Sequence, residues 1–188
     1  MDHLGYRQAI VGGVSMGAGI AACFAGEFPE RAKAVLIIDS NTAAGLPVSD
    51  AVAATRTKTI QLCEAGNMDA VAEYFLANSP AYQLFAAKSS HNEARLQDMI
   101  KSINPTGFAN TLRSMLVAET TTRDLTRITS PTLVMAGDKD PAMKAIELTA
   151  NTISHCTFTK IGNAGHLSNI DQPDLFAQSV ADFLGGLN

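Results

Sequence analysis

The sequence lacks the features that mark membrane, secreted and nucleic-acid-binding proteins. None of its apolar runs approaches the roughly 18 residues that cross a membrane. Its first residues, MDHLGYRQ, have no basic segment followed by an apolar stretch, as a signal peptide would. The formal net charge is −4 and basic residues do not cluster, which argues against nucleic-acid binding. We therefore expect neither a membrane nor a nucleic acid as a partner.

Cysteine is also scarce, and its spacing excludes two further classes of protein. The three cysteines, Cys23, Cys63 and Cys156, are odd in number and are spaced like neither a metal site nor a disulfide framework. This usage fits a reducing compartment, and we expect a cytoplasmic protein. What remains, 188 residues that are 46% hydrophobic and 17% charged, has the composition of an ordinary globular protein.

Short apolar runs alternate with helical patterns at both ends of the chain. Strands are expected at residues 8–13, 33–39, 130–137 and 156–162. The segment 17–32 predicts a helix that ends near the Phe28-Pro29 pair. Further helices are expected at 141–153 and from an N-cap at Asp171 to a stop at Gly185. Between these ends the pattern predicts helices at 50–64, 68–77, 92–103 and 106–119, with caps at Asp50, Asn67 and Asn104. The alternation predicts an α/β fold with a parallel sheet and right-handed crossovers.

Three residues with reactive side chains follow predicted strands. Ser15 follows the first strand within G-x-S-x-G, where Gly13 and Gly17 are expected to let strand and helix pass closely. Asp140 follows the third strand and His166 the fourth. Because ligands bind beyond the carboxyl ends of parallel strands, we expect these side chains at one edge of the sheet. A serine in a strand-to-helix turn, followed by an acid and a histidine, indicates nucleophilic catalysis.

With these residues identified, the whole chain resembles the α/β-hydrolase family. The segment VGGVSMGAGIA resembles its nucleophile turn, and ITSPTLVMAGDKDPA resembles the strand and loop of its catalytic acid. The segment IGNAGHLSNIDQPDLFAQSVADFL resembles its histidine loop and last helix, and GHLSNIDQP is most similar to the 3-oxoadipate enol-lactonase branch and its esterase relatives. The resemblance implies a parallel sheet with helices on both faces and an inserted helical cap. It divides the chain into core residues 1–45, cap residues 46–120 and core residues 121–188.

The resemblance also implies a reaction. Ser15 would attack a small carboxylic ester or lactone, His166 would act as its base, and Asp140 would orient the histidine. The backbone N–H of Met16 would donate to the oxyanion. No metal and no cofactor are expected. The alternatives are a catalytically silent remnant of the fold, and a C–C bond hydrolase or perhydrolase built on the same fold.

The acid has competitors within the sequence. Asp140 fits the family spacing G-x-x-D, but Asp138 lies in the same loop. Asp39 ends the second predicted strand, where some relatives of the family carry their acid. The remaining histidines stand in polar or terminal stretches and are expected at the surface: His3, His91 and His155.

One departure from the family concerns the segment before the first strand. Members carry several strands, a helix and a loop with the second oxyanion donor before the part that resembles MDHLGYRQAIVGG. We therefore expect the N-terminal part of the sheet to be missing and the first strand to have an open edge. Such an edge is a template for pairing, so a homo-oligomer through this strand is expected. With one oxyanion donor in place of two, we expect this chain alone to be weakly active or inactive.

Overall fold

The computed structural model describes residues 1–40, 49–118 and 124–187. The chain divides into two compact units. The sheet unit comprises residues 1–46 and 122–188, and the helical unit comprises residues 47–121. The borders predicted between core and cap, after residues 45 and 120, lie outside the described residues. The division into core, cap and core therefore stays a prediction.

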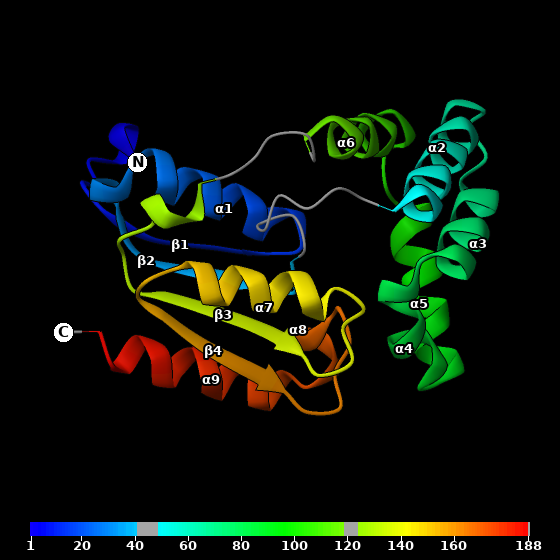
Figure 1. Ribbon diagram of the computed structural model, residues 1–188. Coiled ribbons are helices and arrows are strands. Elements are labelled where there is room, and N and C mark those ends of the chain that lie inside the picture. Colours follow the sequence, from blue (N-terminus) through cyan, green and yellow to red (C-terminus); the bar gives the residue numbers. More distant parts are fainter. Residues whose placement is uncertain (41–48, 119–123, 188) are drawn as a thin grey trace. The chain divides into compact units, whose positions relative to one another are not determined.

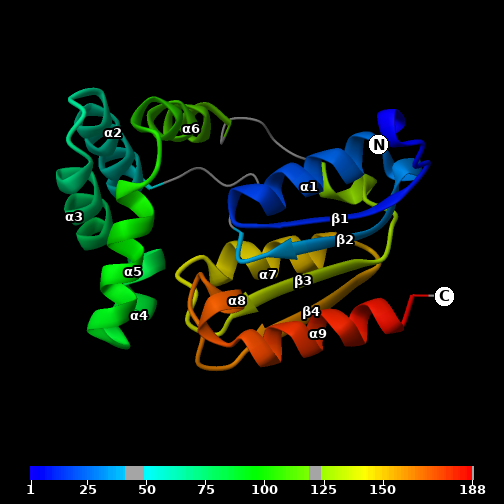
Figure 2. The ribbon, with the colours of Figure 1, turned by 180° about the vertical axis from the view of Figure 1, so that it is seen from behind.

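The described part of the sheet unit contains four parallel strands in the order β1-β2-β3-β4 (Figure 1, Figure 2). They are β1 (Ala9–Val14), β2 (Ala32–Ile38), β3 (Thr132–Gly137) and β4 (Cys156–Ile161). All four predicted strands are confirmed, and each end differs from the prediction by no more than two residues. The inner strand β3 is buried along its whole length, as expected for a parallel sheet covered on both faces.

Helices cover both faces of this sheet. The helices α1 (Met16–Glu27) and α7 (Met143–Thr152) lie on one face, and α9 (Pro173–Gly185) lies on the other (Figure 1). Because alternate residues of a strand point to opposite faces, Ile37 packs with the first pair of helices and its neighbour Ile38 packs on the side of α9. Burying each such side chain stabilises the fold by about 1.5–3 kcal/mol.

Small residues bring α1 close to the sheet. Its buried face consists of Ala18, Gly19, Ala21, Ala22, Ala25 and Gly26. The helix ends at Glu27, one residue before the Phe28-Pro29 pair. Proline disfavours helical geometry in the residue before it, so the predicted end of this helix is confirmed.

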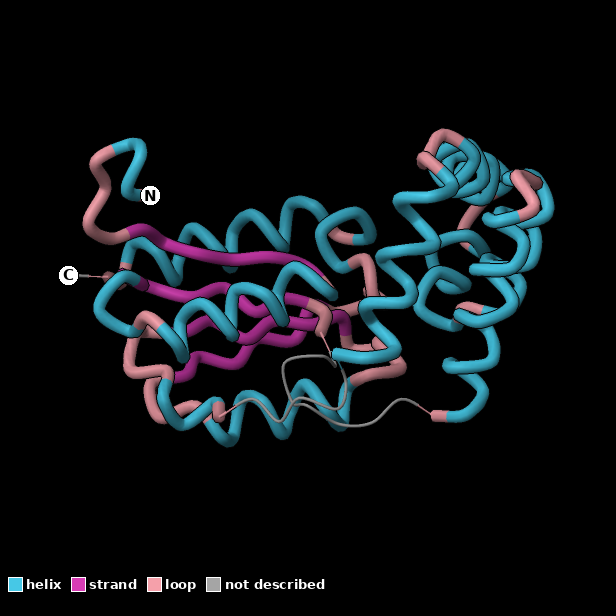
Figure 3. Tube along the Cα trace, turned by 90° about the horizontal axis from the view of Figure 1, so that it is seen from above, coloured by secondary structure: helices cyan, strands magenta, loops and turns pink. Residues whose placement is uncertain are grey.

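The helical unit consists of helices and loops in its described part (Figure 3). The helices are α2 (Asp50–Glu64), α3 (Met68–Asn78), α4 (Pro80–Ala87), α5 (Ser90–Lys101) and α6 (Pro105–Ala118). Four of them were predicted, whereas α4, with eight residues, was not. Asn67 caps α3 as expected, but the N-cap of α2 is Ser49 rather than Asp50. Asn104 accepts a hydrogen bond from the N–H of Gly107 in the first turn of α6 (2.9 Å).

The end of the sheet unit differs from the prediction in three respects. A short helix, α8 (Ser168–Asp171), precedes α9, and the N-cap of α9 is Gln172 rather than Asp171. Pro173 is the first residue of α9, where its fixed φ suits a helix start. Gly185 belongs to the helix, and Gly186 follows it. Asp171 is therefore not a cap of the last helix.

Membrane spans and metal sites can also be sought among the described residues. Within residues 1–40, 49–118 and 124–187, no helix is both long and apolar enough to cross a membrane. The same ranges contain no group of three or more His, Cys, Asp or Glu side chains that could bind a metal ion.

Two of the cysteines lie in regular elements. Cys63 is buried in α2 and Cys156 is half-buried in β4, and burial raises the pKa of both thiols.

Candidate active site

Ser15 lies in the turn between β1 and α1. Its N–H donates to the carbonyl oxygen of Ile38 at the end of β2 (2.8 Å). Its backbone has φ 54° and ψ −117°, and a positive φ is uncommon for a residue with a side chain. A serine at a helix N-cap ordinarily accepts a hydrogen bond from the first helical turn, but the side chain of Ser15 makes no such bond. The turn thus directs the hydroxyl away from the helix that it begins.

Glycine is required on one side of Ser15 only. A Cβ at Gly13 would lie 2.6 Å from the carbonyl oxygen of Gly17 and 2.8 Å from the nitrogen of Ala18. The turn can therefore close only because Gly13 has no side chain. A Cβ at Gly17 would have no neighbour within 4 Å. The expectation that both glycines permit the close passage is thus wrong for Gly17, whose backbone is the group that approaches Gly13.

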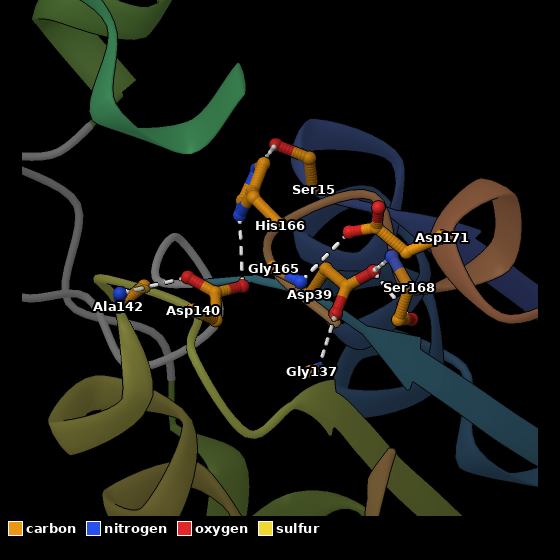
Figure 4. A network of polar contacts seen from close by, with 9 residues as sticks. All are labelled: Ser15, Asp39, Gly137, Asp140, Ala142, Gly165, His166, Ser168 and Asp171. Carbon is orange, nitrogen blue, oxygen red and sulfur yellow. Dashed lines mark hydrogen bonds and ion pairs between the residues drawn. The ribbon is translucent and has the colours of Figure 1, made fainter. Parts of the chain in front are cut away.

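The imidazole of His166 joins Ser15 to the loop after β3 (Figure 4). Its Nε2 lies 2.9 Å from Ser15 Oγ, and its Nδ1 lies 2.9 Å from Asp140 Oδ2. The imidazole is 10% exposed, and the side chain of Asp140 is fully buried. With its proton on Nδ1, the ring donates to the carboxylate and can accept the hydroxyl proton at Nε2. The structure therefore brings together the three residues that the sequence analysis selected.

The loop that carries Asp140 is fixed by backbone contacts. Its second carboxylate oxygen, Oδ1, accepts a hydrogen bond from the N–H of Ala142 (2.7 Å). A Cβ at Gly137, the last residue of β3, would meet the carbonyl oxygens of Ala164 and Gly165 well inside van der Waals contact. The acid loop and the histidine loop therefore touch through their backbones, which requires glycine at residue 137.

The other two candidate acids bind backbone groups. Asp138 is exposed, and its Oδ1 accepts a hydrogen bond from the N–H of Ala164 (3.2 Å). Asp39 is fully buried, and its Oδ1 accepts from the N–H of Gly137 (3.1 Å). Its Oδ2 accepts from both the N–H (2.9 Å) and the hydroxyl (2.7 Å) of Ser168. Of the three candidates, Asp140 has the hydrogen bond to the imidazole described above.

The electrostatic environment of Asp39 is unusual for a carboxyl group. Burial raises its pKa from the ordinary value of 3.8 to about 6. The hydrogen bonds from Ser168 and Gly137 and the charge of a protonated His166 lower the pKa, but they do not offset the burial. The ionised form of this carboxyl is therefore costly in the folded protein.

Two residues close to His166 in the sequence make contacts that the sequence did not predict. Oδ2 of Asp171 accepts a hydrogen bond from the N–H of Gly165, the residue before His166 (2.8 Å). Ser168, two residues after the histidine, binds Asp39 as described. Both stand within the segment GHLSNID, so their nearness to His166 in the sequence was visible. Their residue types gave no further signal, because serine and aspartate are equally typical of helix caps.

The remaining sequence candidates lie where they were expected along the chain. Met16 is the first residue of α1, so its N–H belongs to the first turn, which has no intrahelical acceptor. The positive end of the helix dipole favours negative charge at this position. The other histidines are exposed, as predicted: His3, His91 and His155.

This arrangement can make a hydroxyl nucleophilic at neutral pH. A serine hydroxyl is a weak nucleophile until an adjacent base takes its proton. Nε2 of His166 is within hydrogen-bond reach for that transfer, and the carboxylate of Asp140 can stabilise the resulting imidazolium.

The chain is similar to known proteins in sequence as well as in fold. Residues 1–173 match the family described as alpha/beta hydrolase fold. A related protein, 3-oxoadipate enol-lactonase 2 of Acinetobacter baylyi, is 29% identical over 191 aligned residues. The alignment covers 96% of this chain, and the chain spans 65% of the length of that protein.

Solved structures with the same fold include an enol-lactonase and an esterase. The enol-lactonase from Burkholderia xenovorans LB400 superposes with a TM-score of 0.81 at 23% identity and covers 98% of this chain, which in turn covers 68% of that structure. A thermophilic esterase from Thermogutta terrifontis has a TM-score of 0.79 at 25% identity. The superposition covers 99% of this chain and 68% of the esterase. The likeness in fold therefore extends over nearly the whole chain.

Proposed function

Because the chain belongs to the alpha/beta hydrolase fold family, we propose that it is a serine hydrolase in which Ser15 is the nucleophile. In this proposal His166 is the general base and acid, and Asp140 orients the imidazole and stabilises its protonated form. The observation that carries the proposal is the continuous series of contacts from Ser15 Oγ through both imidazole nitrogens to Asp140 Oδ2, each 2.9 Å long.

The reaction proceeds in two halves. Ser15 Oγ attacks the carbonyl carbon of the substrate while its proton passes to Nε2 of His166. The bond from the carbonyl carbon to the leaving oxygen then breaks, and that oxygen takes the proton from Nε2, which leaves an acyl-enzyme. Water repeats the sequence, giving its proton to Nε2, and the carboxylic acid is released as Ser15 regains its proton. Donation from the N–H of Met16 to the carbonyl oxygen stabilises the negative charge in both halves.

The proposed substrate is a small carboxylic ester or a lactone. In a lactone the leaving oxygen remains attached to the acyl group, so the same two halves give one hydroxy acid. The enol-lactonase and esterase relatives named above favour this substrate class. Because the chain spans 65% of the length of the first of these relatives, its own activity and substrates are part of the proposal. The reaction as written needs no metal and no cofactor, and a cytoplasmic location also stays a prediction.

A fluorophosphonate probe tests the assignment of the nucleophile. Attack by Ser15 Oγ on phosphorus would displace fluoride and leave a covalent adduct, which mass spectrometry of peptides locates. We expect labelling at Ser15 and none in Ser15→Ala. The matched control is Ser154→Ala, which changes an exposed turn of the sheet unit and should leave labelling unchanged. Labelling that survives in Ser15→Ala would refute the assignment.

Substrate comparison separates the reaction classes. The wild-type chain should hydrolyse short aryl esters or simple lactones faster than diketones that require C–C cleavage. Faster cleavage of the diketones would replace the ester proposal with C–C hydrolysis. If Ser15 is not labelled and none of these substrates is turned over, a catalytically silent member of the family is favoured.

A further inference from the structure

Asp39 contacts both elements that carry the partners of Ser15. Its carboxylate accepts the N–H of Gly137, the last residue of β3, three positions before Asp140. It also accepts two hydrogen bonds from Ser168, two positions after His166. Figure 4 shows the side chain of Asp39 between these partners. One buried side chain thus connects the acid loop to the histidine loop.

The backbone of Asp39 is also held by hydrogen bonds to neighbouring elements. Its N–H donates to the carbonyl oxygen of Met135 in β3 (2.9 Å), and its φ is 47°, in the left-handed region. The residue before it, Ile38, accepts the N–H of Ser15. The end of β2 is therefore hydrogen-bonded to the nucleophile turn on one side and to β3 on the other.

From these contacts we infer that Asp39 is a positioning residue, which fixes His166 between Ser15 and Asp140 by binding Ser168 and Gly137 at the same time. The inference rests on the proposed function of the three residues. It assigns Asp39 no contact with the substrate and no share in the proton transfers.

The hydrogen-bond donors around residue 39 explain why its side chain is a carboxylate. Three hydrogens point at the side chain from two directions, two from Ser168 and one from Gly137. An ionised carboxylate accepts at both oxygens, whereas an amide places an NH₂ group against one of the donors. Asp39 keeps these bonds although burial raises its pKa to about 6, so the loop connection is formed at an electrostatic cost.

Other ionisable groups lie on the loops around Asp39. They are His166 and Asp171 on the histidine side, and Asp138, Lys139 and Asp140 on the loop after β3. Asp39 and His166 interact electrostatically: the protonated imidazole favours the ionised carboxylate.

Steady-state kinetics of Asp39→Asn test the inference. The substitution keeps the size of the side chain and turns one acceptor into a donor. Because the imidazole would no longer be held in its reactive position, kcat should fall roughly tenfold to a hundredfold, while KM changes little. The matched control is Ser130→Ala, which removes a buried hydrogen bond to Ala32 (2.6 Å) and should lower thermal stability without changing kcat.

A second variant covers the case in which Asp39→Asn does not fold. Ser168→Ala removes the hydroxyl donor and leaves the N–H bond to Asp39, so kcat should fall by less than in Asp39→Asn. In the double variant the Ser168→Ala step should have almost no further effect, because the two residues act through one contact. Wild-type kcat in both single variants, or in Ser168→Ala where Asp39→Asn does not fold, would overturn the inference.

A spectroscopic measurement separates this inference from the proposed function. The Nδ1 proton of His166 gives a downfield NMR signal while the imidazole is hydrogen-bonded to Asp140. The signal should persist in Ser130→Ala and broaden or vanish in Asp39→Asn. If the wild-type chain shows no labelling at Ser15, the proposed function fails, and this signal still tests Asp39. If the wild-type chain is labelled but the signal is unchanged in Asp39→Asn, the positioning role fails alone.

Discussion

The two sides of the candidate site are stabilised in different ways. On the histidine side, donors of the segment 164–168 are bound by four carboxylates, those of Asp39, Asp138, Asp140 and Asp171. On the serine side, Ser15 follows β1, which is an edge strand of the described sheet and leaves Ile10 44% exposed. The turn at Ser15 depends on backbone packing at Gly13 and on a hydrogen bond to Ile38.

Because the two sides are stabilised differently, substitutions on each side should have different effects. Polar contacts on the histidine side connect loops that are far apart in the sequence and set the direction of one imidazole. Changes there should alter the rate more than the fold. On the serine side, backbone packing at Gly13 determines whether the turn forms, and the outer edge of β1 has no neighbouring strand in the described sheet. Changes there should alter stability and association first.

The largest effect should come from the acid on the histidine side. Asp140→Asn leaves the shape of the side chain but can reverse the imidazole tautomer, and a comparable change in a serine protease lowers kcat by about 10⁴-fold. We expect a loss of this order for aryl ester hydrolysis, with little change in thermal stability. Asp138→Asn, in the same loop but exposed, is the control and should lower kcat less than tenfold. A larger loss in Asp39→Asn than in Asp140→Asn would identify Asp39 as the catalytic acid.

A glycine pair tests the serine side. In Gly13→Ala the new Cβ would lie 2.6 Å from the carbonyl oxygen of Gly17, and relieving that contact should lower the free energy of unfolding by about 3 kcal/mol or more. Gly17→Ala meets open space and should leave stability equal or raise it by up to about 1 kcal/mol, since alanine favours helices. Urea denaturation of both variants measures the difference. Equal losses would contradict the claim that only Gly13 permits the close passage.

The buried carboxyl of Asp39 predicts a pH dependence of stability. Its pKa is about 6 in the folded protein and about 3.8 when unfolded. The folded state is therefore favoured by the neutral carboxyl below about pH 4, and this contribution is lost as the pH rises to 6. The loss approaches about 3 kcal/mol. Urea denaturation between pH 4 and 7 should show the wild-type free energy of unfolding falling relative to that of Asp39→Asn. A constant difference would mean that the carboxyl is not destabilised by burial.

The sequence predicted the elements that depend on local patterns. The strands β1, β2 and β3 are largely apolar runs, whereas β4 (CTFTKI) mixes threonine and lysine with apolar residues. The carboxyl ends of parallel strands meet at one edge of the sheet, so the nearness of Ser15, Asp140 and His166 followed from topology. Helices of eight and four residues, α4 and α8, are too short to show a clear period and were missed. The fold class and the family were correct because they depend on the order of these elements.

Contacts between distant residues could not be predicted in the same way. The bond between Asp39 and Ser168 joins positions that lie 129 residues apart, and neither residue type specifies such a partner. Gly13 and Gly17 are identical in type, and only the packing of one backbone against the other distinguishes them. Asp171 looked like a helix cap because caps and loop contacts use the same carboxylate chemistry.

The smallest expected effect concerns association through β1. The strand, AIVGGV, contains no charged residue, and its outer edge has no neighbouring strand in the described sheet. Such an edge can pair with a second copy of the chain, so light scattering should show a mass that rises with concentration. Ile10→Lys places a charge beside this edge and should weaken association by about tenfold, or about 1.4 kcal/mol. Leu175→Lys, at an exposed apolar residue of α9, is the control and should leave the mass unchanged. A monomer at every concentration, or equal effects of both variants, would show that the edge of β1 is not the contact between copies.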